Sequence, residues 1–565
     1  MVMRVSTGMI FDAGVNTINR QTSNLLHLQQ EVSLGRRIVT PSDDPVGAAR
    51  ALVVQQSIDI TAQWSTNHNN VKSALGNEEA QLTSVNDLMT RVRQLTVQAG
   101  NSTLTASDRR SITQELRARF DELVGIANAD DGTGQYIFSG YMGSTKPFGG
   151  SVDQLIKNPL QDVVYQGDDG QRKLQASATR FIGVSDSGND VFMNIRNGNG
   201  SFVTAYKSGN FGTGVIDAGS VINPAAWASV PDANKENLEV RFYSDAGTVG
   251  SVDVSVGLPL TVTPGANDQF MISVEGKSPA LVTLAAGSYT TTSGLAAAAQ
   301  TAVNTALGAS PPSAGAATVA VDGSGHLLVS PNGGASTISL TAAGANSGFT
   351  TLFGTPTQSV GNTYYDLVMV DATTPANTVS LLTGAAPAIP TFPGVPAGLR
   401  PYHAGQPISF SGLSTAPPMP TDFGVSVTVN GAPANGDVFS VTPSTQQSVF
   451  RTLANLIGTL ENANSNSPAS LAQLSNEVGF ALTNLDQANE NFLRVRANIG
   501  SRLSEIDSLG SVNEDLTVQY KQSLSDIQDL DYAKTYSDLT RKQMDLEAAQ
   551  KSYVSVSKLS LFNYI

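Results

Sequence analysis

The 565-residue chain contains no cysteine. This absence excludes disulfides, thiolate zinc sites, iron–sulfur clusters and cysteine nucleophiles. Histidine is also scarce: His27, His68, His326 and His403 are scattered, and no two of them have the spacing of a metal-ligand pair. We therefore expect no catalytic residues, no metal and no cofactor, and we predict that the protein is not an enzyme.

Basic residues are also few: the chain has 33 Lys and Arg against 47 Asp and Glu, which gives a formal net charge of −14. An acidic chain without a basic stripe binds phosphate backbones poorly, so we expect no nucleic-acid partner. The longest uncharged run is polar and glycine-rich, whereas a membrane span needs roughly 20 mostly apolar residues. No membrane insertion is expected. The first residues lack the features of a cleaved signal peptide, so export by another route is the expectation for an extracellular protein.

Proline is nearly absent from both ends of the chain. Only Pro41, Pro45 and Pro468 lie before residue 141 or after residue 450, which leaves 26 − 3 = 23 in the middle. Because proline disrupts a helix interior, the ends can form long helices and the middle cannot. The predicted fold class is therefore α+β and multidomain: long coiled-coil-like helices from both chain ends pack together, and β-rich modules are inserted in the middle.

Apolar residues recur at intervals of three and four in both helical zones, which is typical of a coiled-coil-like seam. In the first zone, such positions between residues 71 and 99 predict a helix of roughly 35 residues. We assign ten positions to a subunit-packing seam: Val71, Leu75, Leu82, Val85, Met89, Val92, Leu503, Ile506, Leu524 and Ile527. Beyond a phase slip at 529–532, a second stripe comprises Leu539, Leu546, Ala549, Tyr553 and Val556. Periodicity alone leaves open a bundle within one chain; stripes that run almost to residue 565 favour assembly.

The expected domains follow these zones. Residues 1–40 and 521–565 form the two halves of an inner helical domain, and 41–145 and 446–520 form those of an outer one. The intervening 146–445 is β-rich, with two modules and an insertion near 270–425. The two modules rest on a weak repeat, PGANDQF at 264–270 and PANGDVF at 433–439, each followed by a helix-permissive run. We also expect residues 136–138 (YIF) to form a strand leaving the helical zone.

Several motifs resemble the bacterial flagellin family. Residues 34–38 (LGRRI) and 41–51 (PSDDPVGAARA) are similar to its N-terminal signature, and 91–101 (RVRQLTVQAGN) to its next block. At the other end, 529–533 (DLDYA) resembles the C-terminal signature. The opening 3–7 (MRVST), 134–140 (GQYIFSG) and the closing 559–565 (LSLFNYI) are similar to members at the hook–filament junction rather than to filament flagellins.

The resemblance implies a structural protein of the extracellular flagellum, exported by the flagellar type III apparatus, that joins hook and filament. Implied partners are copies of itself, the neighbouring hook-associated protein, flagellin and a cytoplasmic export chaperone. The second stripe would line the inner tube and bind that chaperone. Alternatives are a filament flagellin and, in the middle domain, an adhesin or carbohydrate-binding module; only ten charged residues between 251 and 450 argue against a hydrolase there.

A lesser implication concerns Arg91, Leu95 and Glu115, which fall where flagellins present a surface to an animal innate receptor. The alternative is that these residues stabilise a helix pair, and we favour it.

Overall fold

The computed structural model describes residues 7–210, 212–244, 247–274, 278–308, 317–321, 325–331, 338–359, 363–371, 378–387, 398–414, 420–463 and 468–558. The motifs at 3–6 and 559–565 lie outside these residues. The chain separates into two compact units. The terminal unit comprises Met1–Asn77, Arg172–Val184 and Asn498–Ile565, and the central unit comprises Glu78–Gln171 and Ser185–Ala497.

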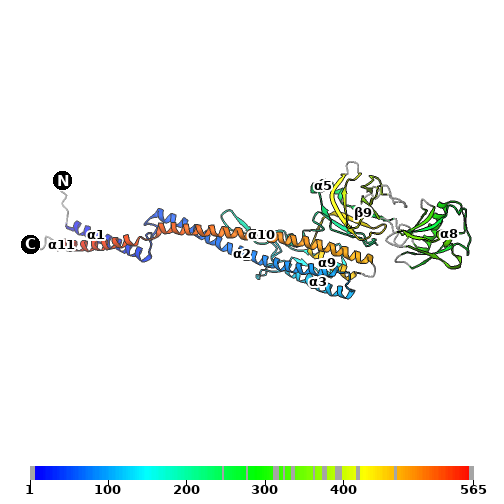
Figure 1. Cartoon of the computed structure of the whole chain (residues 1–565). Helices are drawn as coiled ribbons and strands as arrows, with labels where there is room; N and C mark the ends of the chain where they lie inside the picture. Colours follow the sequence, from blue (N-terminus) through cyan, green and yellow to red (C-terminus); the bar gives the residue numbers. More distant parts are fainter. Residues whose placement is uncertain are drawn as a thin grey trace, which may run out of the picture. The chain divides into compact units, whose positions relative to one another are not determined.

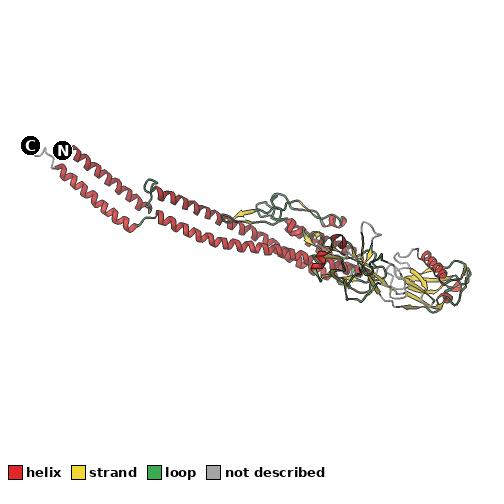
Figure 2. Ribbon diagram, turned by 90° about the horizontal axis from the view of Figure 1, so that it is seen from above, coloured by secondary structure: helices red, strands yellow, loops and turns green. Residues whose placement is uncertain are grey.

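The terminal unit is built from paired helices, α1 (Thr7–Leu34) with α11 (Tyr532–Lys558) and the first part of α2 (Pro45–Ala99) with the last part of α10 (Pro468–Gln528). Figures 1 and 2 show α1 beside α11. The Phe11 and Tyr553 rings meet edge to face with centroids 5.6 Å apart. Each helix thus covers part of the apolar surface of a partner from the other end of the chain.

Helix α2 is 55 residues long and extends well beyond the predicted seam. Its start is fixed by Asp44, whose carboxylate accepts a hydrogen bond from the Gly47 N–H at 2.8 Å, and by Pro45 at the first helical position. From there to Ala99 the sequence contains no further proline, so nothing ends the helix earlier.

A short hairpin, β3 (Lys173–Gln175) and β4 (Phe181–Gly183), also belongs to the terminal unit. His68 is buried beneath it, with Nε2 2.7 Å from the Ala176 carbonyl oxygen, and Arg180 pairs with Glu505 of α10. His68 is therefore a structural residue that attaches the hairpin to α2.

The helical part of the central unit combines the remainder of α2 and α10 with α3 (Ala106–Ala127), α4 (Val152–Lys157) and α9 (Val449–Asn462). Short elements connect them: β1 (Phe148–Gly149) pairs with β2 (Val164–Tyr165), β5 (Ile195–Arg196) pairs with β25 (Gln446–Gln447), and Asn189–Met193 forms the π-helix η1.

A cluster of aromatic rings forms the centre of this bundle. The Phe192 ring lies 5.2 to 6.0 Å, centroid to centroid, from the rings of Phe138, Phe148, Phe450 and Phe492. All five side chains are fully buried. Five separate segments of the chain therefore meet at one point in the core.

The strand predicted over 136–138 is wrong. Tyr136 makes only an isolated bridge with Asp130, and the chain then turns so that Phe138 enters the aromatic cluster. The Phe138 carbonyl accepts a hydrogen bond from the Tyr165 hydroxyl at 3.0 Å, which replaces the strand pairing it would otherwise need.

The first β module has one core between two sheets. The larger sheet has the order β20-β19-β9-β24-β6, with β21 also paired to β19; the smaller has the order β22-β23-β7, with β8 also paired to β23. The strands are β6 (Phe202–Tyr206), β7 (Val215–Ile216), β8 (Ser220–Val221), β9 (Leu238–Ser244), β19 (Thr363–Met369), β20 (Val379–Ser380), β21 (Arg400–Pro401), β22 (Pro407–Ser411), β23 (Asp422–Asn430) and β24 (Val438–Pro443); α5 (Pro224–Ser229) and α6 (Asp232–Lys235) complete the module.

The second β module is inserted between β9 and β19 and has its own core, which includes Phe270, Leu295 and Phe353. Its elements are β10 (Gly247–Asp253), β11 (Leu260–Val262), β12 (Gln269–Val274), β13 (Ala280–Thr283), β14 (Gly287–Tyr289), α7 (Thr292–Leu307), β15 (Ala317–Val321), β16 (His326–Pro331), β17 (Ile338–Ala342), η2 (Gly344–Asn346), α8 (Phe349–Phe353) and β18 (Thr357–Ser359). The insertion thus lies at 247–359 rather than near 270–425, because β19 to β23 return to the first module.

The two copies of the weak repeat form the same local structure. Each Asp side chain closes a turn: Asp268 accepts from the Gly265 N–H at 3.1 Å, and Asp437 from the Ala434 N–H at 2.8 Å. A strand follows at once, β12 or β24, in which Phe270 or Phe439 is buried.

We predict that Phe192→Ala destabilises the helical bundle of the central unit by about 3–5 kcal/mol, since it leaves a cavity among four rings. Phe181→Ala is the matched control, because the Phe181 side chain is 55% exposed and its loss is expected to change the free energy of unfolding by about 0.5 kcal/mol or less. Urea unfolding followed by near-UV circular dichroism measures both, and equal midpoints for the two variants would contradict a central role for the cluster.

Candidate functional site

The two signature motifs of the chain ends lie against each other in the terminal unit. The Arg37 N–H donates to the Gln528 carbonyl at 2.8 Å, and the Leu530 N–H donates to the Gly35 carbonyl at 3.2 Å. The Arg37 guanidinium also donates to the Ile527 carbonyl at 3.0 Å. Residues separated by about 490 positions in the sequence thus fix the point where α1 gives way to α2 and α10 to α11.

Gly35 is required at this point for two reasons. Its φ of +68° is one that other residues rarely adopt, and a Cβ added there would lie 2.8 Å from the Tyr532 hydroxyl. The glycine of the N-terminal motif therefore leaves the space that the tyrosine of the C-terminal motif occupies.

The turn before α2 is organised by Asp43. Its carboxylate accepts hydrogen bonds from the N–H groups of Thr40 (2.6 Å) and Val39 (3.0 Å). It also lies 3.0 Å from Nε2 of His27, whose Nδ1 is 3.1 Å from Glu31. The Thr40 N–H, with the Thr40 hydroxyl and the His27 ring, lowers the pKa of Asp43 to about 2.

Seven of the ten seam positions are buried within the single chain, each with 3% exposure or less: Val71, Leu75, Leu82, Val85, Met89, Val92 and Ile506. Leu503, Leu524 and Ile527 are half-buried. The buried seven hold α2 and α10 in their own helical bundle. A seam between subunits made by these residues remains a prediction and would require α2 to change partners.

The second stripe lies on α11. Leu539, Leu546, Ala549 and Tyr553 are half-buried, and Val556 is exposed. Ala549, Tyr553 and Val556 line an apolar groove of about 310 Å³ together with Phe11 and Gly14 of α1. The stripe is therefore only partly covered by α1.

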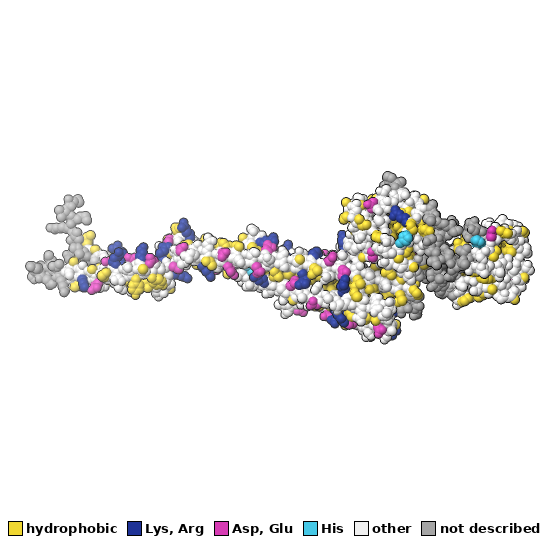
Figure 3. Space-filling view, viewed as in Figure 1, with side chains coloured by type: hydrophobic (Ala, Val, Ile, Leu, Met, Phe, Trp, Pro, Cys, Tyr) yellow, Lys and Arg dark blue, Asp and Glu magenta, His cyan; other side chains and the backbone are white. Residues whose placement is uncertain are grey.

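Other apolar side chains of the terminal unit are left exposed, and the sequence analysis missed them because they fall outside the seam. On α2 and α10 they are Val46, Leu52, Val53, Ile60, Val512 and Val518, with Leu52 71% exposed. Figure 3 shows hydrophobic side chains scattered among charged ones on the surface of the helices. Leu52 and Val53 are adjacent on α2, and these exposed apolar side chains are accessible to other molecules.

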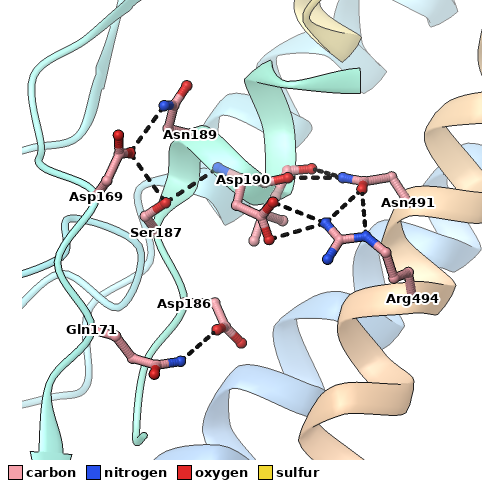
Figure 4. Close-up of polar contacts among 9 residues, drawn as sticks. Asp169, Gln171, Asp186, Ser187, Asn189, Asp190, Asn491 and Arg494 are labelled. Carbon is pink, nitrogen blue, oxygen red and sulfur yellow. Dashed lines mark hydrogen bonds and ion pairs between the residues drawn. The ribbon is translucent and has the colours of Figure 1, made fainter. Parts of the chain in front are cut away.

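In the central unit, α10 holds the segment around η1 by polar contacts (Figure 4). Arg494 donates to both carboxylate oxygens of Asp190 at 3.0 Å, and the Asn491 amide donates to the carbonyls of Asp190 and Val191 at 2.9 Å. These contacts bring Phe192 into the aromatic cluster. The sequence gives no periodic signal for them, because they join residues about 300 positions apart.

The three residues at the position of the flagellin receptor surface, Arg91, Leu95 and Glu115, make the contacts expected of a stabilised helix pair. Arg91 of α2 forms two hydrogen bonds with Glu115 of α3, at 2.8 and 3.1 Å, and Leu95 is 2% exposed. These contacts support the structural interpretation of the three residues.

Among the described residues, no three His, Asp or Glu side chains are placed to hold a metal ion. Within the same part of the chain, no helix has the length and apolarity needed to cross a membrane.

We predict that Asp43 stabilises the turn at 39–44 above pH 4 and that this contribution is lost as the pH falls from about 4 to 2. The sign follows because the folded pKa, about 2, lies below the ordinary value of 3.8. The melting temperature of Asp43→Asn should lie below that of the natural protein at pH 6, and most of the difference should be lost at pH 2. Asp545→Asn, on an exposed side of α11, is the control; a difference for Asp43→Asn that is unchanged at pH 2 would contradict the prediction.

Comparison with known proteins agrees with the geometry. Residues 5–142 match the family model of the bacterial flagellin N-terminal helical region. The flagellar hook-associated protein 3 of Salmonella typhimurium is 30% identical over 193 residues, which cover 34% of this chain and 58% of that protein. The flagellin of Bacillus subtilis is 30% identical over 202 residues, covering 34% of this chain and 61% of that protein. The chain therefore matches somewhat less than two thirds of the length of these relatives.

The crystal structure of the flagellar junction protein FlgL from Legionella pneumophila matches with a TM-score of 0.50 at 21% identity, over 85% of this chain and 99% of that one. This likeness confirms the predicted fold class of long terminal helices with a β-rich middle. The family-model match over residues 5–142 and the similarity to flagellar hook-associated protein 3 confirm the resemblance to the flagellin family and, within it, to that protein.

Proposed function

We propose that this chain is a structural, non-enzymatic component of the bacterial flagellum that joins the hook to the filament. The observation that carries the proposal is the fold shared with a flagellar junction protein over 85% of the chain, combined with the flagellin-type helical region. The pairing of the two signature motifs at Gly35 and Leu530 supports it, since both chain ends then act as one structural element.

The buried and exposed apolar residues have different roles in this proposal. Leu82 and its buried neighbours stabilise the single chain, whereas Leu52, Val53 and Val518 are available to copies of the same chain and to the neighbouring hook-associated protein and flagellin. Burial of the exposed set on assembly would contribute about 25 cal/mol per Å² of apolar surface. Exposed residues on α2 and α10 are therefore the proposed assembly surface.

We also propose a role for α11 in export, before assembly. The half-covered stripe of α11, from Leu539 to Val556, becomes fully accessible once α11 leaves α1. A cytoplasmic chaperone would bind this stripe and keep the chain from associating before it passes through the flagellar type III export apparatus.

Immunogold electron microscopy of intact cells, with antibody against residues 200–425, tests the location. We expect label confined to a narrow band at the base of the filament. Label along the whole filament would identify a filament flagellin, the second candidate, which the similarity to Bacillus subtilis flagellin keeps open. Label away from flagella would overturn both.

We predict that Leu52→Asp prevents junction formation while leaving the monomer folded, because the side chain is exposed and its loss changes stability by about 0.5 kcal/mol or less. Leu82→Asp and Val85→Asp should also prevent junction formation, but by unfolding the helical bundle, since a buried unpaired charge costs several kcal/mol. Motility in complemented cells and thermal unfolding of the purified monomer separate the two effects.

The control is Gln56→Asp, which adds the same charge to an exposed polar position of α2. It should leave motility and stability unchanged. Normal motility with Leu52→Asp would show that this part of α2 is not an assembly surface.

A further inference from the structure

The central unit contains a cavity of about 560 Å³ that the proposed function does not use. It is lined by residues of α9 and of the first turns of α10, by Leu155, Ile156 and Pro159, and by Tyr206 of β6. The volume falls within the range of small-molecule sites, about 300–1,000 Å³. The lining combines apolar side chains, among them Leu155, Ile156 and Pro159, with polar ones.

Among the described residues that line the cavity, Glu477 is the one acidic residue, and none is Lys, Arg or His. Its carboxyl group is hydrogen-bonded to the Tyr206 hydroxyl, which is a neutral partner. Burial raises the pKa of Glu477 and raises that of Tyr206 to about 12. Both pKa values rise because the ionised form of each group carries a negative charge in a poorly solvated place with no cation beside it.

The two helix ends at the cavity do not supply the missing positive charge. The carboxyl end of α9 reaches it at Asn462 and has no basic residue in its last turn. The amino end of α10 reaches it at Ser470 and carries a partial positive charge. The partial negative charge at the carboxyl end of α9 offsets that positive charge. Glu477 therefore sets the sign of the potential in the cavity.

Further polar groups are free to contact a ligand. The side chains of Asn455 and Thr459 line the cavity and form no hydrogen bond with the described residues. An aliphatic cation would place its charge at Glu477, its chain against Ile156 and Pro159, and any second polar group near Asn455.

We propose that this cavity is a binding site for a primary ammonium group on an aliphatic chain, with Glu477 as the counter-ion. The source is either a free diamine or a lysine side chain, and both present the same chemistry. The proposal does not depend on the junction role, since it concerns residues of the central unit alone.

Saturation-transfer difference NMR on the full chain at low salt tests the proposal, with cadaverine and Nα-acetyl-lysine methylamide as probes and 1,5-pentanediol as the uncharged control ligand. We expect cadaverine to bind with an affinity at least tenfold above that of pentanediol. Glu477→Gln, which preserves size and the tyrosine partner, should lower the cadaverine affinity at least tenfold. Comparable or tighter binding of the lysine derivative would indicate a polypeptide lysine as the source, and binding of cadaverine alone a free diamine.

Two further variants distinguish binding in the cavity from nonspecific attraction of a cation to an acidic protein. Glu490→Gln removes an exposed carboxylate from the same helix and should leave binding unchanged. Asn455→Trp fills the cavity from an exposed position of α9 and should abolish binding even if Glu477→Gln is poorly folded. Equal binding by the natural protein and both cavity variants, equal affinity for pentanediol, or no binding at all would overturn the proposal.

Discussion

The helical bundle of the central unit depends on the burial of Phe192 among four other phenylalanine rings. Each ring comes from a different stretch of chain, so the cluster cannot form until the turn at 136–138, β1, η1, α9 and α10 are all in place. Edge-to-face and tilted rings of this kind contribute packing beyond their buried area. The Arg494–Asp190 pair and the Asn491 amide then hold η1 in position from outside the core.

In the terminal unit, the two ends of the chain stabilise each other by backbone hydrogen bonds rather than by side chains alone. Gly35 and Arg37 pair with Leu530 and Gln528 at the point where both helix pairs are interrupted. The interruption separates two kinds of helical surface: a buried seam in α2, and a partly covered stripe in α11. In the proposed function, the stability of the monomer and its capacity for assembly are therefore assigned to different residues of the same helices.

The sequence predicted the helical ends and their stripes because proline exclusion and three–four spacing are local signals, as at Leu82, Val85 and Ile506. It also predicted the repeat around Asp268 and Asp437. It could not assign the seam to one chain or to two, since periodicity records that a face is buried and not what buries it. The strand expected at 136–138 failed because the position of Phe138 is decided by Phe192, which is distant in sequence.

Local sequence signals also could not locate the ends of the inserted module, because these ends depend on which strands pair. Ser244, at the end of β9, lies opposite Thr363, at the start of β19, in the antiparallel ladder. The chain therefore leaves the first module and re-enters it at directly facing positions. A folded unit whose own ends are close together can therefore be inserted here without separating β9 from β19. The surface that this protein presents can thus diversify in size and chemistry while its helical framework stays constant.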